Sequence, residues 1–371
     1  MVHDVVVIGA SVAGLTAARR LATDGFDVVV LDPNPEGASA AIGHGVAACA
    51  HSSTVTTMSA AYGTEAVNEH VRRNLVGMEE IRRVLATGDV PHRVLPLHDH
   101  SLGVALDREL VPTLELLASA GAEVRLLGRD ETRRPGAGIV SEAILVDPAQ
   151  YAGALAAQAA HAGADIRYDM TVTHLVRRDG VTAVAARPNL AWAREVHSML
   201  AVAVVDTLGV SPWGRMAGNG AAQYVPRVRF RVAQVPDVVT LSAGPPVWLV
   251  RPDGDEAVAY GPKYPASGRG DGVAELERFV TGRLGGTDLR SGTMAIDPSD
   301  HGRPAVGASP IPGGFYARGN GRGELMNGTA SGTFLAALLL GLESSHQNNA
   351  LPMSSRLRAS ARGLRQRLLG H

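Results

Sequence analysis

The sequence predicts an α/β protein in which a Rossmann-like dinucleotide-binding domain carries an inserted mixed-sheet α+β domain. Three observations lead to this fold. Residues 2–32 follow a strand, glycine turn, helix, strand pattern, a second strand and glycine-rich loop lie near residue 320, and segments between them alternate apolar and polar residues. A chain of 371 residues is long enough for two such domains.

The N-terminal segment supplies the first element of this fold. Val5–Ile8 is a continuous apolar run, typical of a strand buried on both faces. Gly9 follows, and apolar residues then recur at positions 12, 15, 18 and 21, which is helical spacing. Val28–Leu31 is a second apolar run. This order is the βαβ unit in which a glycine motif indicates dinucleotide binding.

The turn from the first strand into the helix has the sequence GASVAG. Gly9 allows the sharp turn and Gly14 allows the helix to pack closely on the sheet. Ser11 is small enough for backbone to approach a pyrophosphate, and its hydroxyl can donate to a phosphate oxygen. Because a helix N-terminus presents free N–H groups to anions, Val12 and Ala13 are expected to line the same site.

Asp32 and the segment after it help to choose the dinucleotide. Asp32 ends the second strand, 18 residues after Gly14, where its carboxylate can hold a ribose diol. An acid here disfavours a 2′-phosphate, which makes NADP the poorest candidate. Residues 33–45 are small and glycine-rich, which suggests backbone passing beneath a large flat ring. The alternative is a βαβ unit of another doubly wound protein with a fortuitous GxSxxG motif.

A second strand, loop and helix lie near the other end of the chain. Phe315–Arg318 is expected to be a short strand, Gly319–Asn327 a glycine-rich loop, and Gly328–Leu342 an apolar helix. This helix N-terminus lies more than 300 residues after the first one. The two glycine loops are therefore predicted to meet in space around one ligand.

Together these regions resemble the FAD-dependent D-amino-acid oxidase superfamily, in the group with glycine oxidase and sarcosine oxidase. The matching stretches are VVVIGASVAGLTAARRLATDGFDVVVLD, EGASAAIGHG, VDPAQYAGALAAQAAHAGADI and DHGRPAVGASPIPGGFYARGNGRGELMNG. The resemblance implies an FAD-binding domain of the glutathione-reductase-2 type, FAD as the cofactor, and a small-molecule amine or amino-acid-like substrate.

The resemblance also implies which residues contact FAD. The second loop would flank the flavin ring, with its helix dipole facing the N1–C2=O edge, and the strand over residues 166–176 would carry an adenine contact. The expected cofactor-binding residues are Gly9, Ser11, Val12, Ala13, Gly14, Asp32, Pro33, Ser39, Ala40, Val172, Gly319, Gly321, Arg322, Gly323, Glu324 and Leu325.

The strand patterns between these segments give a domain layout. The FAD-binding domain is expected to be discontinuous and to comprise residues 1–85, 146–214 and 297–345. Residues 86–145 and 215–296 are assigned to the substrate domain, where VRFRVAQV, PVWLVRP and EAVAYGPKY are typical of antiparallel strands. Residues 346–371 are predicted to be a basic C-terminal helix or tail that packs on its own subunit, with a dimer contact or an acidic partner as the alternative.

Three residues are candidates for catalysis, in which the substrate would pass a hydride to flavin N5. Lys263, the only lysine, could stabilise superoxide forming from O2 beside the reduced flavin; the alternative is a solvated lysine at a strand end. His44 could bind substrate, accept a proton or tether the flavin covalently, or pack near the ring without chemistry. Arg322 could pair with a substrate carboxylate or the flavin edge.

One position departs from the pattern of the resemblance. Amino-acid oxidases of this group carry an arginine just before the late proline–aspartate stretch, where this chain has Met294. Arg290 is offset by four residues, which is about 13 Å along a strand. This difference favours a less anionic amine, or a tailored secondary metabolite, at least as much as a free α-amino acid.

Composition narrows the classes of ligand and the cellular location that the chain can have. Thirty-five basic residues face 36 acidic ones, which gives no electrostatic case for nucleic acid or an anionic membrane. Cys49 is the single cysteine and is expected to be an inert buried thiol, and His98–Asp99–His100 signals no third ligand, so no metal site is expected. Without a recognisable secretory signal or an apolar run of membrane-spanning length, we expect a cytoplasmic protein.

The leading hypothesis is therefore an FAD-dependent amine or amino-acid oxidase or dehydrogenase, with O2 as the expected acceptor. One alternative is a flavin-dependent monooxygenase of a biosynthetic pathway, although DHGRPAVG stands where those enzymes have a GD-containing signature. Another is a flavin-binding partner subunit without turnover of its own. The oligomeric state stays open, with a homodimer as one option.

Overall fold

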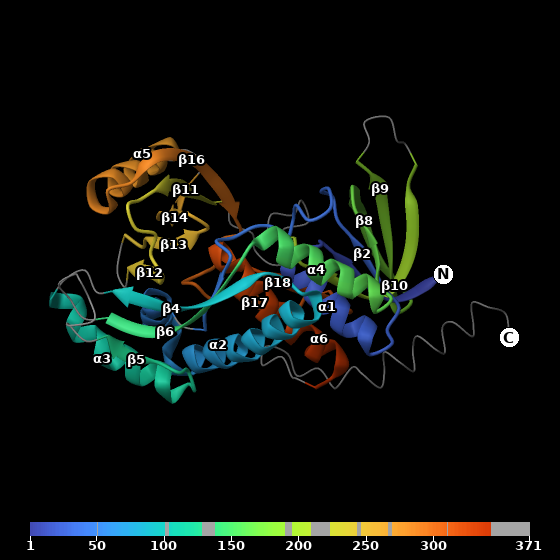
Figure 1. Cartoon of the computed structure of the whole chain (residues 1–371). Helices are drawn as coiled ribbons and strands as arrows, with labels where there is room; N and C mark the ends of the chain where they lie inside the picture. The colour runs from blue at the N-terminus through green and yellow to red at the C-terminus, as the bar shows by residue number, and fades with distance from the viewer. Residues whose placement is uncertain are drawn as a thin grey trace.

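The computed structural model describes residues 1–49, 51–100, 104–127, 138–189, 195–208, 223–242, 246–265, 269–309 and 311–342. These residues form two large sheets and the helices that cover them (Figure 1). The predicted basic segment 346–371 lies outside the described residues.

The first sheet contains the predicted βαβ unit and the predicted late strand. Its strands are β1 (Val2–Ile8), β2 (Val28–Leu31), β7 (Asp165–Arg167), β8 (Met170–Arg178), β9 (Val181–Pro188), β10 (His197–Asp206), β17 (Ala305–Ala308) and β18 (Gly314–Arg318). The order is β17-β18-β10-β1-β2-β7, and β8 and β9 extend from β10. Because β1 runs parallel to β2 and β10, and β10 parallel to β18, their carboxyl ends meet at one edge.

Three helices pack on this sheet: α1 (Val12–Thr23), α4 (Pro148–His161) and α6 (Thr329–Leu340). The predicted N-cap Asp147 begins α4, and its carboxylate accepts from the next two free backbone N–H groups. At Gly332 on α6, an added Cβ would lie 2.3 Å from the carbonyl oxygen of Ala13 on α1. The late helix therefore packs directly on the first helix, which brings the two glycine loops together.

The second sheet holds the strands predicted for the substrate domain. Its strands are β3 (Val46–Ala47), β4 (His92–His100), β5 (Arg125–Leu127), β6 (Gly138–Val146), β11 (Gln223–Arg231), β12 (Val239–Ser242), β13 (Leu249–Asp253), β14 (Glu256–Tyr260), β15 (Tyr264–Pro265) and β16 (Thr287–Ile296). The order is β15-β11-β14-β13-β12-β4-β6-β3, with β16 paired to β11 and β5 to β6. The segments VRFRVAQV, PVWLVRP and EAVAYGPKY overlap β11, β13 and β14.

Three long helices were not expected from the sequence: α2 (Ser52–Gly88), α3 (Val104–Ser119) and α5 (Arg269–Phe279), which η4 (Val280–Leu284) continues. The prediction of alternating strands was wrong for α5 in residues 215–296 and for α3 in residues 86–145. There Leu110 and Leu117 are buried seven residues apart, which is two helical turns. In α2, Gly63 has φ 79° and ψ 175°, so the helical conformation is interrupted and one apolar periodicity does not run through it.

The buried apolar side chains of the described residues form four clusters. The largest cluster joins β1, β2 and β10 to α1, α2, α4 and α6, with Leu15, Leu21 and Tyr151 fully buried. A second cluster lies on one face of the other sheet, around Leu97, Val225 and Tyr260. Among the described helices, none combines the length and the apolar character that crossing a membrane requires.

Candidate functional site

The first glycine loop forms a tight turn onto the N-terminus of α1. Gly9 has φ +105°, and an added Cβ at Gly14 would lie 2.0 Å from the Gly9 carbonyl oxygen. Ser11 is the N-cap of α1, where its Oγ accepts from Gly14 N at 3.1 Å. Because a hydroxyl can accept and donate at once, its proton remains available for a phosphate oxygen.

Asp32 is fully buried directly after β2. Its two oxygens accept from Ala10 N at 2.5 Å, Asn34 N at 2.7 Å and Ser39 Oγ at 2.9 Å. Burial raises the pKa of this carboxyl, and the hydrogen bonds act in the opposite direction. The side chain of Asn34 also hydrogen-bonds to this carboxylate, so a ribose hydroxyl would share or displace one of four donors. Its contact with ribose stays a prediction.

Ser39, Ala40, Pro33 and Val172 were also expected to contact the cofactor, and Ser39 bonds directly to Asp32. Ser39 and Ala40 are buried, and Pro33 is half-buried with its carbonyl accepting from the Asn189 side chain. Val172 on β8 is buried in an apolar cluster that includes residues of β1 and β2. Their contacts with a cofactor remain predictions.

The second glycine loop follows β18 and continues into η5 (Gly321–Gly323) and η6 (Glu324–Gly328), which lead into α6. Gly319 and Gly321 have φ values of +73° and +64°. Asp297 holds this loop, because its carboxylate accepts from Gly319 N and its carbonyl accepts from Gly321 N at 2.9 Å. The loop is therefore held by the residue that follows β16 as well as by its connection to α6.

The segment after Asp32 reaches the second loop. His44 N donates to the Arg322 carbonyl oxygen at 3.2 Å, and an added Cβ at Gly43 would lie 3.0 Å from that oxygen. Leu325 is buried, and Gly323 lies between Arg322 and Glu324 in the same turn. The structure thus brings residues near 43 and residues near 322 into direct contact.

A cavity of ≈ 760 Å³ lies beside this contact. It is bounded by the second loop, by the first turns of α2 and by apolar side chains of the second sheet. Its lining includes His44, His51, His70, Leu241, Leu249, Lys263, Ile296, Arg322, Gly323 and Met326. This volume lies within the usual range of about 300–1,000 Å³ for small-molecule sites. The tight glycine turn, the available Ser11 proton and this adjoining cavity fit FAD.

Arg322 brings a positive charge into the cavity. Its Nη1 donates to the carbonyl oxygens of Val247 at 3.3 Å and Gly261 at 3.2 Å. Burial lowers the pKa of the guanidinium to about 10, so it stays charged at neutral pH. Within the described part of the chain, no carboxylate forms an ion pair with it, so its charge remains available for an anion.

Lys263 lies between β14 and β15, at an exposed position that also lines the cavity. Desolvation lowers the pKa of its ammonium, and the charge of Arg322 adds to the shift. Arg322 and Lys263 therefore place two cations at the same cavity. Such a cavity favours negative groups and disfavours a second ammonium.

Three histidines line the same cavity in their neutral form. His44 is buried, and its Nδ1 accepts from Val46 N at 3.2 Å, so its Nε2 carries the proton and donates. Burial, followed by neighbouring positive charges, holds the pKa of His44 well below its usual value. Burial also lowers the pKa values of His51 and His70 to about 4.

His51 and His70 were not predicted, because both belong to the unpredicted helix α2 or its N-cap. Asp99 fixes the start of this helix: its Oδ2 accepts from Ser52 N at 2.6 Å, and burial raises its pKa to about 6. The His98–Asp99–His100 segment lies along β4. The described residues contain no group of three histidine, cysteine or acidic side chains placed to hold a metal ion.

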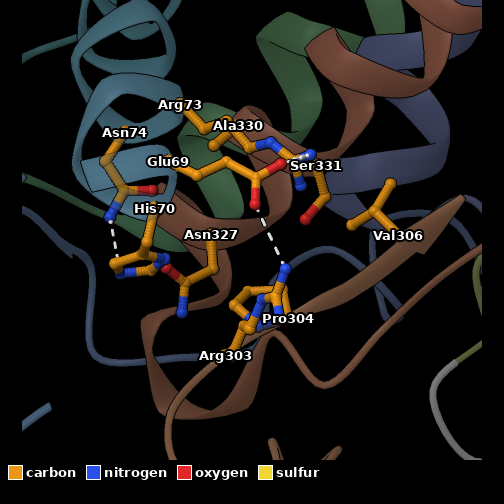
Figure 2. A pocket seen from close by; sticks show the side chains of 10 residues that line it. All are labelled: Glu69, His70, Arg73, Asn74, Arg303, Pro304, Val306, Asn327, Ala330 and Ser331. Carbon is orange, nitrogen blue, oxygen red and sulfur yellow. Dashed lines mark hydrogen bonds and ion pairs between the residues drawn. The ribbon is translucent and has the colours of Figure 1, made fainter. Parts of the chain in front are cut away.

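A small cavity of ≈ 20 Å³ adjoins the large one, and His70 and Asn327 line both. Figure 2 shows these two side chains next to each other, with Arg303 reaching Glu69 beyond them. Arg303 Nη2 lies 3.1 Å from Glu69 Oε2. The volume is about that of one ordered water molecule.

Met294, which departs from the resemblance, and the nearby Arg290 both have other partners. Met294 Sδ accepts from Gly43 N at 3.0 Å, so it supports the segment next to the second loop. Arg290 forms an ion pair with Glu256 on β14. Arg322, rather than Arg290, is therefore the arginine that lines the cavity. Cys49 is buried, and burial raises the pKa of its thiol.

Comparison with known proteins gives one family. Residues 4–338 match the family model described as FAD dependent oxidoreductase. No curated protein sequence matches the chain.

Several solved structures share the fold at low identity. Glycine oxidase from Bacillus cereus has 16% identity and a TM-score of 0.71, over 94% of this chain and 98% of that one. L-proline dehydrogenase from P. horikoshii has 14% identity and a TM-score of 0.73, over 92% and 94%. Iminodiacetate oxidase from Chelativorans sp. BNC1 has 18% identity and a TM-score of 0.69, over 95% and 98%. The predicted fold class is confirmed.

Proposed function

Since this chain belongs to the family of FAD-dependent oxidoreductases and FAD is its cofactor, we propose that it oxidises a C–N bond of an amine or amino-acid-like substrate, with O2 as the acceptor. FAD supplies, when bound, the acceptor for two electrons from the substrate carbon. The similar structures are named for substrates that carry both an amine and a carboxylate, which supports this substrate class.

The observation that carries the proposal is the free positive charge of Arg322 in the cavity. Its Nη1 is engaged by two neutral carbonyl oxygens, which leaves Nε and Nη2 without a partner among the described residues. A guanidinium presents such a pair of N–H groups in the geometry that matches a carboxylate. Arg322 would therefore hold a substrate carboxylate and fix the position of the carbon next to the amine.

The charges of the cavity would also set the protonation state of the amine. Arg322 and Lys263 raise the cost of a third positive charge in the cavity. The pKa of Lys263 is itself lowered, first by desolvation and then by the charge of Arg322. The substrate amine would therefore enter its reactive neutral form without a strong side-chain base. His44, with its proton on Nε2, can orient the substrate by donating a hydrogen bond.

Lys263 is assigned to the step with O2. It lies at the rim of the cavity, where a cation can stabilise negative charge that develops on oxygen.

The test is a substrate panel on the FAD-loaded protein under anaerobic conditions. The panel pairs α-amino acids, N-methylated amino acids and iminodiacids with amines of the same carbon skeleton that lack the carboxylate. We expect the flavin absorbance to be bleached by the carboxylated members first, and peroxide to form when air is admitted. Bleaching only with NADPH would instead indicate a monooxygenase, and bleaching by no substrate would indicate a non-catalytic subunit.

A further inference from the structure

Glu324 is an acidic side chain at the place where the sequence motif assigns the diphosphate of FAD. It begins η6 and is only 7% exposed. The backbone N–H of Val12, the first residue of α1, hydrogen-bonds to its carboxyl, as does the side chain of Asn320. Its Oε1 has no hydrogen-bond partner among the described residues. A buried carboxyl oxygen is thus left over at the N-terminus of α1.

Close packing holds this carboxyl between η6 and α1. An added Cβ at Gly328 would lie 2.9 Å from Glu324 Oε1 and 3.0 Å from Val12 Cβ. The N-terminus of a helix binds phosphate through its free N–H groups and its partial positive charge. Glu324 therefore uses the donor that the motif provides for a phosphate oxygen.

The neighbours of Glu324 decide when it carries a charge. The titratable and charged groups on the elements around it are Asp297, Arg318, Asp206, Arg322, His70 and His44. Arg318 is paired with Asp206, and both histidines are neutral above pH 7. Burial, followed by repulsion from Asp297, raises the pKa of Glu324 to about 8.

We propose that Glu324 gates the binding of FAD by its protonation state. The neutral carboxyl releases the Val12 N–H and can donate its own proton to a phosphate oxygen, whereas the ionised carboxylate keeps that N–H and repels the diphosphate. Binding of FAD would thus take up a proton at alkaline pH. The proposal rests on FAD being the cofactor and is independent of the substrate.

The test measures the FAD dissociation constant of the apoprotein between pH 6 and 9 by quenching of flavin fluorescence. Only the protonated fraction binds, so affinity should be flat up to about pH 7 and weaker by about 11-fold at pH 9, where about one carboxyl in 11 is still neutral. Glu324→Gln, which is always neutral, should bind FAD equally at all pH values. Glu142→Gln, which removes one acid from the exposed face of β6, should keep the wild-type dependence.

Two results would overturn the proposal: a wild-type dissociation constant that varies less than twofold up to pH 9, or a Glu324→Gln protein that weakens with pH as the wild type does. Glu324→Ala serves as a second neutral variant if the glutamine protein does not fold. Calorimetry in buffers of different ionisation enthalpy should show uptake of about 0.9 proton at pH 9. A pH-dependent affinity without bleaching by any amine would sustain this proposal while refuting the proposed oxidation.

Discussion

Replacing Arg322 by methionine tests how the cavity recognises its substrate. Methionine keeps much of the length and apolar volume of the side chain and removes the charge. Nε and Nη2 are the guanidinium nitrogens without a partner among the described residues, so a carboxylate would be held through these two. The expectation is a selective loss of activity toward substrates that carry a carboxylate.

The magnitude follows from these two hydrogen bonds. A hydrogen bond to a charged group contributes about 1.5–3 kcal/mol. Because the cavity is open, the lower value applies to each of the two bonds, which gives a total of about 3 kcal/mol. This corresponds to a loss of about 150-fold in kcat/KM, since 1.4 kcal/mol is a factor of ten. For the methyl ester of the same substrate, which has no carboxylate charge, we expect a change of less than about threefold.

The assay compares kcat/KM for an amino acid and its methyl ester in the wild type and in Arg322→Met. Arg290→Met is the matched control, because it removes an arginine that pairs with Glu256 on the second sheet. The control should leave the ratio of acid to ester unchanged. Equal losses for acid and ester in Arg322→Met, or no loss for the acid, would refute carboxylate binding by Arg322.

Three further predictions test single features. Lys263→Met should slow reoxidation of the reduced flavin by O2 at least about tenfold in stopped flow and leave anaerobic reduction unchanged; equal reoxidation rates would remove Lys263 from this step. Gly332→Ala should cost about 1–3 kcal/mol of unfolding free energy, since its Cβ would meet the Ala13 carbonyl, whereas Gly153→Ala on α4, with nothing within 4 Å, should be neutral or stabilising in the same urea titration. His70 has a pKa of about 4 in the folded chain, below the unfolded value of about 6.5, so the unfolded chain gains the proton first as the pH falls. Between pH 7 and 5 the unfolding free energy of the wild type should therefore fall by about 2 kcal/mol relative to that of His70→Gln. A difference between the two proteins that is independent of pH would contradict this.

The elements that could be predicted are those with a strong local signal. The apolar runs of β1 and β2, the glycine turn between them, the Asp147 cap of α4 and the late strand–loop–helix all follow from short stretches of sequence. Each depends on neighbours in the chain, through the apolar period, a capping carboxylate or a glycine. The fold class could therefore be expected before the structure, and the resemblance that these stretches carry implied FAD.

The rest depends on contacts between distant segments. The helix α2 has an interrupted period at Gly63, so the two histidines that it brings to the cavity had no local signal. Likewise, the contact of His44 N with the Arg322 carbonyl joins residues 278 positions apart, and no local pattern shows it. The capping of Val12 N–H by Glu324 is of the same kind.

The central claim is that the two glycine loops together hold one FAD, with the diphosphate on α1 and the ring in the adjoining cavity. Equilibrium dialysis of the apoprotein against FAD and against FMN at pH 7 tests it most directly. We expect saturation at one FAD per chain and an FMN affinity lower by at least about tenfold, since FMN lacks the adenosine half that would reach Asp32. No saturable uptake of FAD, or equal affinity for FMN, would contradict it.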